Sequence, residues 1–346
     1  MSTNIIGAHR ADQAQAPFGS AWFAHWHPVA RSRDLGRKPI ARRVLDREIV
    51  LFRSEAGRIG AMSDRCPHRG MRLSKGCVRG GRLQCPYHGW SYNPEGVAFS
   101  PGNPTLQLTV PTLAVAERYG LVWVKDPAST DALPEWAHDG YEFVHSGSWH
   151  VRAPCEVMLD NFTEVEHTGI AHWQFGYEEG CVGTVANETR CTPNTVEVRT
   201  AGPQKKLSWP GRAFLGLQRG DHLICEWVTE FTPLRCVWYM GWEDPKSQAV
   251  RARCFRAVAY FNPIGKDACQ LSTMYFCKTG AQNSSIVSRL SLPVLRYVLN
   301  REIKLDIHLV ENVTPHPIGP ETSYLSRFDK AIVEQRRRLQ AGVNAV

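Results

Sequence analysis

Short apolar runs that alternate with turn residues dominate the first third of the chain. Between Ile40 and Ala61 they include Ile49–Phe52, and Glu55–Gly57 interrupts them. This pattern predicts a β meander. Tyr119–Val124 predicts a further strand, and residues 91–102, rich in Gly, Pro and Asn, predict turns. We therefore expect a small, mostly β N-terminal domain.

The pattern changes after residues 126–140, whose composition indicates a linker or a surface loop. Residues 155–168 contain neither Pro nor Gly and predict a helix. Two further helices are expected near the end of the chain, over 293–313, with Pro293 in the first turn, and over 323–340. Between the helix over 155–168 and these two helices, strand-like runs predict an antiparallel sheet: Val196–Arg199, Leu223–Val228, Cys236–Met240, Val258–Phe261 and Met274–Cys277.

The length of 346 residues exceeds one ordinary core, so we expect an α+β protein of two domains. The predicted division is an extension over residues 1–21, a first domain with its lead-in and linker over 22–145, and a second domain over 146–346. The apolar fraction of 43% and charged fraction of 21% are typical of a folded protein. The first residues show no apolar signal segment and no twin arginine, and no run is long enough to span a bilayer, so we expect a cytoplasmic protein without membrane contact.

Cysteine usage and charge narrow the possible partners. Eleven cysteines are irregularly spaced, and the nine other than Cys66 and Cys85 show no paired framework, so we expect free, mostly buried thiols. The net charge of +8 fits a basic surface that docks an acidic redox partner, and it fits a merely solvated surface equally well. Nucleic acid is not expected, because the basic residues are scattered, with Arg336–Arg338 as the one run, and no nucleic-acid motif is present.

Two short pairs of metal-ligating residues lie in the N-terminal region. Cys66-x-His68 is followed, after sixteen residues, by Cys85-x-x-His88. Zinc is one interpretation, but zinc fingers with two cysteines and two histidines keep the cysteines in one pair and the histidines in the other. Here each pair mixes one thiolate with one imidazole, which suits a [2Fe–2S] cluster with two Cys on one iron and two His on the other.

A second group of candidate ligands lies in the predicted helix and just after it. Glu164 and His167 are three residues apart and would share a helix face. His167 and His172 are five apart and would diverge on a continuous helix. Gly169 lies between them and would end or kink the helix, so that both imidazoles converge. Two nearby histidines alone are weak evidence for a metal.

The apolar stripe of the helix over 293–313 contains a carboxylate. The stripe runs through Leu295, Leu299, Glu302, Asp306, Leu309 and Val313. A carboxylate on a buried face is costly unless it is paired or binds a metal. Asp306 either pairs with an arginine or joins His167 and His172 in a 2-His-1-carboxylate triad, which suits non-heme Fe(II).

The order of these features resembles the Rieske non-heme iron oxygenases, catalytic α subunit. The resemblance covers roughly residues 20–340 and rests on Cys66-Pro-His-Arg-Gly, Cys85-Pro-Tyr-His-Gly-Trp, Asn161-x-x-acidic-x-x-His-x4-His and an Asp on a late helix. The short length resembles the homotrimeric branch that includes vanillate O-demethylase, dicamba monooxygenase and the caffeine N-demethylases. The family implies an N-terminal Rieske β domain and a catalytic domain with a curved antiparallel sheet gripped by helices.

The resemblance also implies a function. The cluster on Cys66, His68, Cys85 and His88 would receive electrons from NAD(P)H through a separate flavin reductase or ferredoxin, and His167, His172 and Asp306 would hold Fe(II). O2 would then be used to hydroxylate or oxidatively demethylate a small, aromatic substrate, by monooxygenation rather than cis-dihydroxylation. The family usually has Asp at position 164 as a bridge between subunits, and Glu164 would fill that role here.

Several alternatives stay open at this point. Glu164 is either the bridge or a solvated residue, with Glu166 or Asp160 in another role, and His308 is a rival ligand. The alternative to an oxygenase is a Rieske-type electron carrier without oxygenase chemistry, although some 200 residues beyond the cluster argue against this alternative. Aromatic residues of the second half line a pocket or are ordinary core: Trp173, Phe175, Tyr177, Phe214, Trp227, Phe231, Trp238 and Trp242.

Overall fold

The apolar runs in the first third of the chain form strands that pair in three small antiparallel sheets. The computed structural model describes residues 20–45, 47–278, 285–314 and 325–344. Strands pair in the orders β1-β10-β9, β2-β3-β4 and β5-β6-β7-β8, and β2-β3-β4 is the predicted meander. The strands are β1 (His27–Arg31), β2 (Ile40–Val44), β3 (Arg47–Arg53), β4 (Ile59–Ser63), β5 (Cys77–Arg79), β6 (Arg82–Gln84), β7 (Ser91–Tyr92), β8 (Ala98–Phe99), β9 (Ala114–Arg118) and β10 (Leu121–Lys125).

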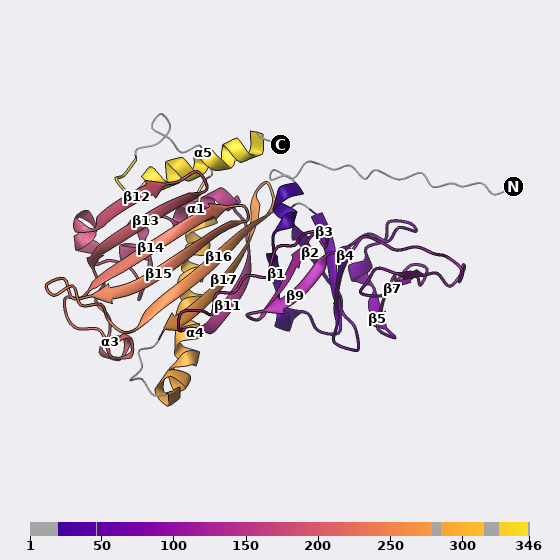
Figure 1. Ribbon diagram of the computed structural model, residues 1–346, viewed down its shortest axis with the longest axis horizontal. Helices are drawn as coiled ribbons and strands as arrows, with labels where there is room; N and C mark the ends of the chain where they lie inside the picture. Colours follow the sequence, from indigo (N-terminus) through magenta and orange to yellow (C-terminus); the bar gives the residue numbers. More distant parts are fainter. Residues whose placement is uncertain (1–19, 46, 279–284, 315–324, 345–346) are drawn as a thin grey trace.

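The second half forms one seven-stranded antiparallel sheet in the order β11-β17-β16-β15-β14-β13-β12, beside the N-terminal sheets (Figure 1). The predicted mixed architecture, an N-terminal β domain followed by an antiparallel sheet with helices, is confirmed. The strands are β11 (Tyr141–Val151), β12 (Ala186–Cys191), β13 (Thr195–Pro203), β14 (His222–Phe231), β15 (Leu234–Glu243), β16 (Cys254–Gly265) and β17 (Ala268–Lys278).

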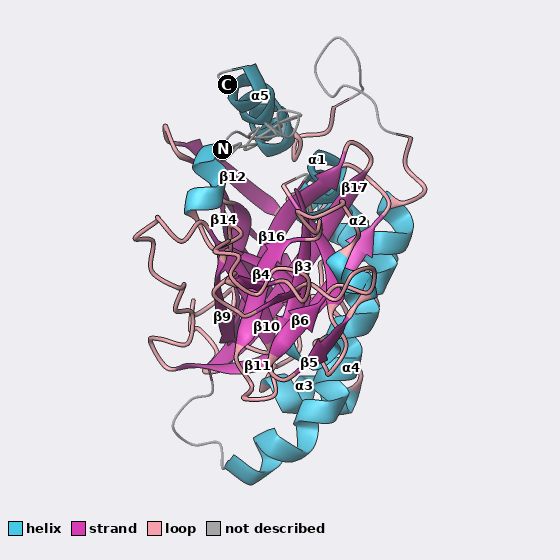
Figure 2. Cartoon of the chain, turned by 90° about the vertical axis from the view of Figure 1, so that its right-hand side faces the viewer, coloured by secondary structure: helices cyan, strands magenta, loops and turns pink. Residues whose placement is uncertain are grey.

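The helices pack mainly around this sheet. α1 contacts both α4 and β16, and α4 contacts β11, so α4 runs along one side of the sheet (Figure 2). α5 lies over β13. The helices are α1 (Cys155–Phe162), α2 (Glu166–Ala171), α3 (Trp209–Leu215), α4 (Ser285–Val310) and α5 (Lys330–Asn344), with short 3-10 helices η1 (Ser20–Ala24), η2 (Ser32–Asp34), η3 (Leu73–Lys75) and η4 (Glu179–Thr184).

Strand β16 is buried on both faces and joins the two halves. Alternate residues of a strand point to opposite faces. Phe255, Ala257 and Ala259 belong to the core shared with the helices. Val258 and Tyr260 pack instead with Trp26, Leu121 and Trp123 of the N-terminal region. The long apolar run of β16 therefore reflects two cores that share one strand.

Strand β3 does the same within the N-terminal region. Ile49 and Leu51 pack in the large core. Val50 and Phe52 pack on the other face, in a small core with Cys66 and Cys85. The two cysteines thus pack against one face of the β2-β3-β4 meander, and this regular sheet fixes their position.

Three details of the sequence prediction are wrong. The helix expected over 155–168 is two helices, α1 and α2, separated at Thr163–Val165, where the Thr163 hydroxyl donates to the carbonyl of Leu159 at 2.8 Å. Pro293 lies inside α4 rather than in its first turn, because the helix already begins at Ser285. A proline there removes one helical hydrogen bond and crowds the preceding turn. The inner stripe of α4 continues through buried Ile303 and Val310, and Leu309 and Val313 are exposed.

Other expectations hold in part. Residues 126–140 form neither helix nor strand. The nine cysteines other than Cys66 and Cys85 form no disulfide, as expected, but only four of the nine are buried. The last predicted helix, expected over 323–340, is observed as α5, and residues 323–324 of the expected range lie outside the described residues. Strands β11 and β12 were not predicted, because their charged and polar residues hide the alternation.

None of the helices in the described ranges is long and apolar enough to cross a membrane.

A buried ion pair fixes α5 to α1, and its loss should destabilise the fold. Arg336 contacts Asp160 with Nη2–Oδ2 at 2.5 Å and Nε–Oδ2 at 3.0 Å, and burial, opposed by Arg336, raises the pKa of Asp160 to about 6. Arg336→Met leaves the buried carboxyl without its partner and should lower the free energy of unfolding by about 3–5 kcal/mol. Urea unfolding measures this. The neighbouring exposed change Arg337→Met is the control and should have little effect. If Arg336→Met lowers the free energy of unfolding no more than the control does, the Arg336–Asp160 pair does not stabilise the fold.

Candidate metal centres

Two loops of matching conformation carry the four cysteine and histidine candidates of the N-terminal region. In the loop between β4 and β5, the Cys66 N–H donates to the Met71 carbonyl at 2.9 Å, and the Gly70 N–H donates to the Cys66 carbonyl at 2.8 Å. In the loop between β6 and β7, the Cys85 N–H likewise donates to the Trp90 carbonyl at 2.7 Å, and the Gly89 N–H donates to the Cys85 carbonyl at 3.2 Å. Gly70 and Gly89 have φ of +72° and +73°, a conformation that favours glycine. The two loops are therefore one turn used twice.

The four side chains divide into a buried pair and an exposed pair. Cys66 and Cys85 are each 2% exposed, whereas His68 and His88 lie on the exposed side of their loops with ring centroids 4.6 Å apart. His68 also stacks on Trp90, with centroids 4.8 Å apart. Each loop thus supplies one inner thiol and one outer imidazole, as required by a [2Fe–2S] cluster with two cysteines on one iron and two histidines on the other. The residues fit that cluster.

Tyr92 lies against one of the thiols. Its hydroxyl is 3.1 Å from Sγ of Cys66. Burial, together with Cys66 and Cys85, raises the pKa of Tyr92, so the hydroxyl keeps its proton. A Cys66 thiolate bound to a cluster has no proton to donate, so there the hydroxyl would be the donor. This residue was not predicted from the sequence; an aromatic residue in a strand after the second loop carries no distinctive signal.

His167 and His172 come from α2 and from the residue just after it. The helix continues through Gly169 and ends at Ala171, and His172 has extended backbone angles of φ −81° and ψ 142°. The expected break at Gly169 is therefore wrong. Gly169 instead allows close packing on η4, because a Cβ there would lie 3.3 Å from Cα of Glu179. The imidazoles converge because the helix stops one residue before His172.

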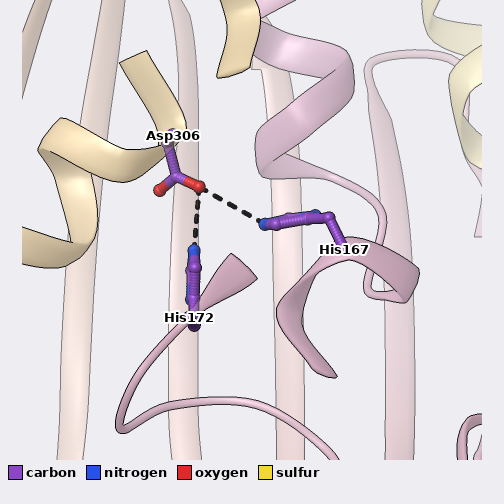
Figure 3. A group of neighbouring side chains, drawn as sticks. All are labelled: His167, His172 and Asp306. Carbon is purple, nitrogen blue, oxygen red and sulfur yellow. Dashed lines mark hydrogen bonds and ion pairs between the residues drawn. The ribbon is translucent and has the colours of Figure 1, made fainter. Parts of the chain in front are cut away.

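Asp306 on α4 completes this group (Figure 3). Its Oδ1 lies 2.8 Å from Nε2 of His172 and 3.4 Å from Nε2 of His167, and one ligand atom of each residue lies within 4.8 Å of the others. Asp306 is 4% exposed. Burial raises the pKa of Asp306, but hydrogen bonds from both histidines outweigh burial and lower it. Two imidazoles and one carboxylate fit a divalent cation such as Fe(II) with positions left open.

The outer nitrogen of each imidazole faces a carboxylate. Nδ1 of His167 contacts Glu164, which also accepts from the backbone N–H of Glu166 at 2.6 Å. Burial lowers the pKa of His167, but Asp306 and Glu164 outweigh it and raise the pKa to about 9. Nδ1 of His172 lies 3.7 Å from Glu302. Glu302 was not predicted to act here, although its place in the apolar stripe of α4 was the same signal that identified Asp306.

The rival candidates lie elsewhere. Asp160 pairs with Arg336, and Glu166 and His308 are exposed. Glu311 pairs with Arg152 at 2.9 Å. The arginine partner considered for Asp306 is absent from its contacts among the described residues, where both histidines take that place.

A cavity of about 160 Å³ opens onto the triad. His167, His172 and Asp306 line it together with apolar side chains of the large sheet, including Ala257, Leu223 and Met240. Of the aromatic residues proposed from the sequence, Phe175, Tyr177, Trp227 and Trp238 line the cavity. The other four do not: Trp173 is 53% exposed, Trp242 is buried, and Phe214 and Phe231 pack beside the large core.

Comparisons with known proteins bear on the N-terminal domain and on the fold. Residues 25–110 match the Rieske [2Fe-2S] domain family. The chain is 34% identical over 161 residues to the oxygenase subunit of vanillate O-demethylase from Pseudomonas sp. (strain HR199 / DSM 7063), which covers 42% of this chain and 44% of that protein. It is 33% identical over 162 residues to the oxygenase component of dicamba O-demethylase from Stenotrophomonas maltophilia, covering 42% and 46%. In these matches the chain spans less than half the length of its relatives.

The likeness of folds extends over nearly the whole chain. A crystal structure of dicamba monooxygenase bound to 3,6-dichlorosalicylic acid superposes with a TM-score of 0.73 at 22% identity, covering 94% of this chain and 98% of that one. Another structure of that enzyme, with non-heme iron and dicamba, gives 0.64 at 20% identity over 94% and 98%. Both halves of the molecule therefore share one known fold.

Tyr92→Phe should lower the reduction potential of the cluster. The change removes the hydrogen bond to Cys66, and loss of a donor to sulfur destabilises the more negative, reduced state. A redox titration of the visible spectrum measures the midpoint. Tyr87→Phe, at a 58% exposed tyrosine next to His88, is the control and should leave the midpoint unchanged. A Tyr92→Phe midpoint equal to that of the native protein would show that the bond has no effect.

Proposed function

We propose that this chain, a relative by sequence and fold of the Rieske oxygenase components of the vanillate and dicamba type, is a terminal oxygenase. It would take electrons from a reductase or ferredoxin, use O2, and hydroxylate or oxidatively demethylate a small, aromatic substrate. The observation that carries this proposal is the triad of half-buried His167 and His172 with buried Asp306 at a largely apolar cavity. An electron carrier needs no such second site.

We assign residues 22–145 to the electron-accepting domain and 146–346 to the catalytic domain. Cys66, His68, Cys85 and His88 would hold the cluster, and His167, His172 and Asp306 would hold Fe(II). When bound, the cluster supplies single electrons and the iron supplies a place for O2 to be activated. Everything else is left to the protein: ligand geometry, exclusion of water and placement of the substrate.

The cavity favours a small, flat, apolar substrate. Its volume of about 160 Å³ is close to that of cavities of about 150 Å³ that take up benzene. Phe175, Trp227 and Trp238 supply aromatic walls, and a dry, apolar wall keeps water away from the triad. These features support a substrate of about one ring, positioned with its reacting group toward His167 and His172.

Electron transfer between two copies of the chain is part of the proposal. The cluster loops, beside β5 and β7, lie at one end of the molecule, and α4 with Asp306 lies in the other part (Figure 1). His68 and His88 are exposed and so are accessible to a neighbouring copy. Glu164 contacts His167 and would accept a hydrogen bond from His88 of the neighbour. Such head-to-tail contacts close into a ring, and we propose a homotrimer.

The remaining partners and the location rest on the sequence and the family. NAD(P)H would be the electron source, through a separate flavin reductase or ferredoxin that docks on the basic surface. We propose that the protein works in the cytoplasm.

Asp306→Ala should abolish oxygenation by removing the mononuclear iron. The triad loses its only carboxylate, so Fe(II) binding should fall below detection, while the distant cluster keeps its visible spectrum. Iron and sulfide analysis, with product analysis on a panel of methoxylated, N-methylated and unsubstituted aromatics, measures both effects. Glu311→Gln, at a carboxylate just beyond α4 paired with Arg152, is the control. An Asp306→Ala protein with full iron and turnover would rule out the triad.

Mixed oligomers should recover activity that neither parent has. His88→Ala damages only the cluster and Asp306→Ala damages only the iron site. If electrons cross between chains, some interfaces of a mixed oligomer pair an intact cluster with an intact iron site, and part of the activity returns. The measurement is substrate-dependent O2 uptake before and after subunit exchange. Verified mixed oligomers that stay inactive, while each parent keeps its undamaged centre, would rule out transfer between chains.

A further inference from the structure

The backbone around His172 lies outside regular structure. α2 ends at Ala171 and His172 is already extended. A helix end leaves its last carbonyl groups without helical partners, and the residues beyond it are free to move unless other contacts hold them. His167 has no such problem, since it lies within α2 and its ring contacts Glu164.

A lysine holds the carbonyl side of this segment. Nζ of Lys205 lies 2.5 Å from the carbonyl oxygen of Gly169 and 2.5 Å from that of His172. The ammonium therefore spans the end of α2 and the candidate ligand itself. Lysine at a helix C-terminus also interacts favourably with the helix dipole. Lys205 is in turn anchored by its own N–H, which donates to the Gly176 carbonyl at 3.1 Å.

A glutamate holds the amide side. The Trp173 N–H donates to Oε2 of Glu302 at 3.2 Å, and the Gln174 N–H donates to Oε1 at 3.0 Å. The same Oε2 lies 3.7 Å from Nδ1 of His172. Glu302 is 4% exposed, so its charge is balanced by these N–H groups rather than by water. It lies one helical turn before Asp306 on α4.

We propose that Lys205 and Glu302 are positioning residues that clamp His172 from both sides, so that it stands in ligand position before a metal ion arrives. The proposal rests on the metal site of the proposed function. One side chain bonds the carbonyl oxygens of 169 and 172, and the other bonds the N–H groups of 173 and 174. Glu302 also places its charge 3.7 Å from Nδ1 of His172, on the side of the ring that corresponds to the Glu164 contact of His167. A carboxylate there favours this ring orientation and increases the basicity of the imidazole.

The clamp makes two groups of predictions for the same variants. Lys205→Met keeps a side chain of similar length and removes the ammonium. Glu302→Gln removes the charge and keeps one of the two acceptor oxygens, so only one of the two amides can retain its bond. Glu302→Met removes the charge and both acceptors. Affinity for Co(II), used as a spectroscopic probe of the triad, should fall about 10–100-fold in each variant. The ligand-field spectrum should change in the Glu302 variants, because the ring of His172 is no longer fixed.

Hydrogen exchange in the metal-free protein tests the clamp without any metal. The amides of Trp173 and Gln174 should exchange slowly in the native chain, faster in Glu302→Gln and fastest in Glu302→Met. The controls are Lys206→Met, at a neighbouring lysine 88% exposed, and Glu311→Gln. Both should match the native protein in affinity, spectrum and exchange.

The outcomes separate the clamp from the proposed function. If Glu302→Gln and Lys205→Met bind Co(II) with native affinity and spectrum, and their exchange equals that of the controls, the clamp is wrong. If the native chain and Asp306→Ala titrate identically with Co(II), the metal site is wrong, and the exchange experiment still decides the clamp. Loss of folding in Glu302→Met leaves Glu302→Gln and Lys205→Met to decide it.

Discussion

The structure depends most on one buried carboxylate. Asp306 is 4% exposed on the apolar side of α4, a placement that is costly unless the charge is compensated. Compensation comes from two imidazoles whose Nε2 atoms point at the same oxygen (Figure 3). The cost of burying Asp306 therefore fixes where α4 lies relative to α2. The geometry of the site and the packing of these helices depend on the same contacts.

The large sheet supplies the rigid frame for that arrangement. β16 and its neighbours are covered on one face by the helices and the cavity and on the other by the N-terminal sheets. The small core beneath Cys66 and Cys85 is continuous, through β3, with the large one. Both candidate metal centres are thus built on loops and helix ends that regular strands hold in place, as a site of fixed geometry requires.

The sequence predicted what is encoded locally. The spacing of Cys66, His68, Cys85 and His88 predicted the candidate cluster site, and Asp306 was selected because a charge interrupts an apolar stripe. The meander was recognised by its alternation, whereas β11 was missed because polar residues such as Glu142 and His145 mask it.

What the sequence did not show depends on tertiary contacts. Lys205 reaches the end of α2 from beyond β13, and Tyr92 meets Cys66 only after the strands pair. Gly169 was predicted to break α2, but close packing on η4 explains this glycine. Pro293 was expected in the first turn of its helix, but α4 begins two turns earlier, at Ser285. Of the eight aromatic residues considered, Trp227 and Trp238 line the cavity because they pair on β14 and β15, and Phe175 and Tyr177 line it from the segment after α2.

The central claim is that one chain carries a cluster and a separate mononuclear iron site, and metal analysis of the purified protein tests it most directly. Iron and acid-labile sulfide should be present at about three and about two per chain, with the visible spectrum of a cluster that has two histidine ligands. A chelator should remove about one iron without changing that spectrum. The contradicting result is about two irons and about two sulfides per chain, even after reconstitution with Fe(II), with no iron that a chelator removes without loss of the spectrum. The protein would then be an electron carrier.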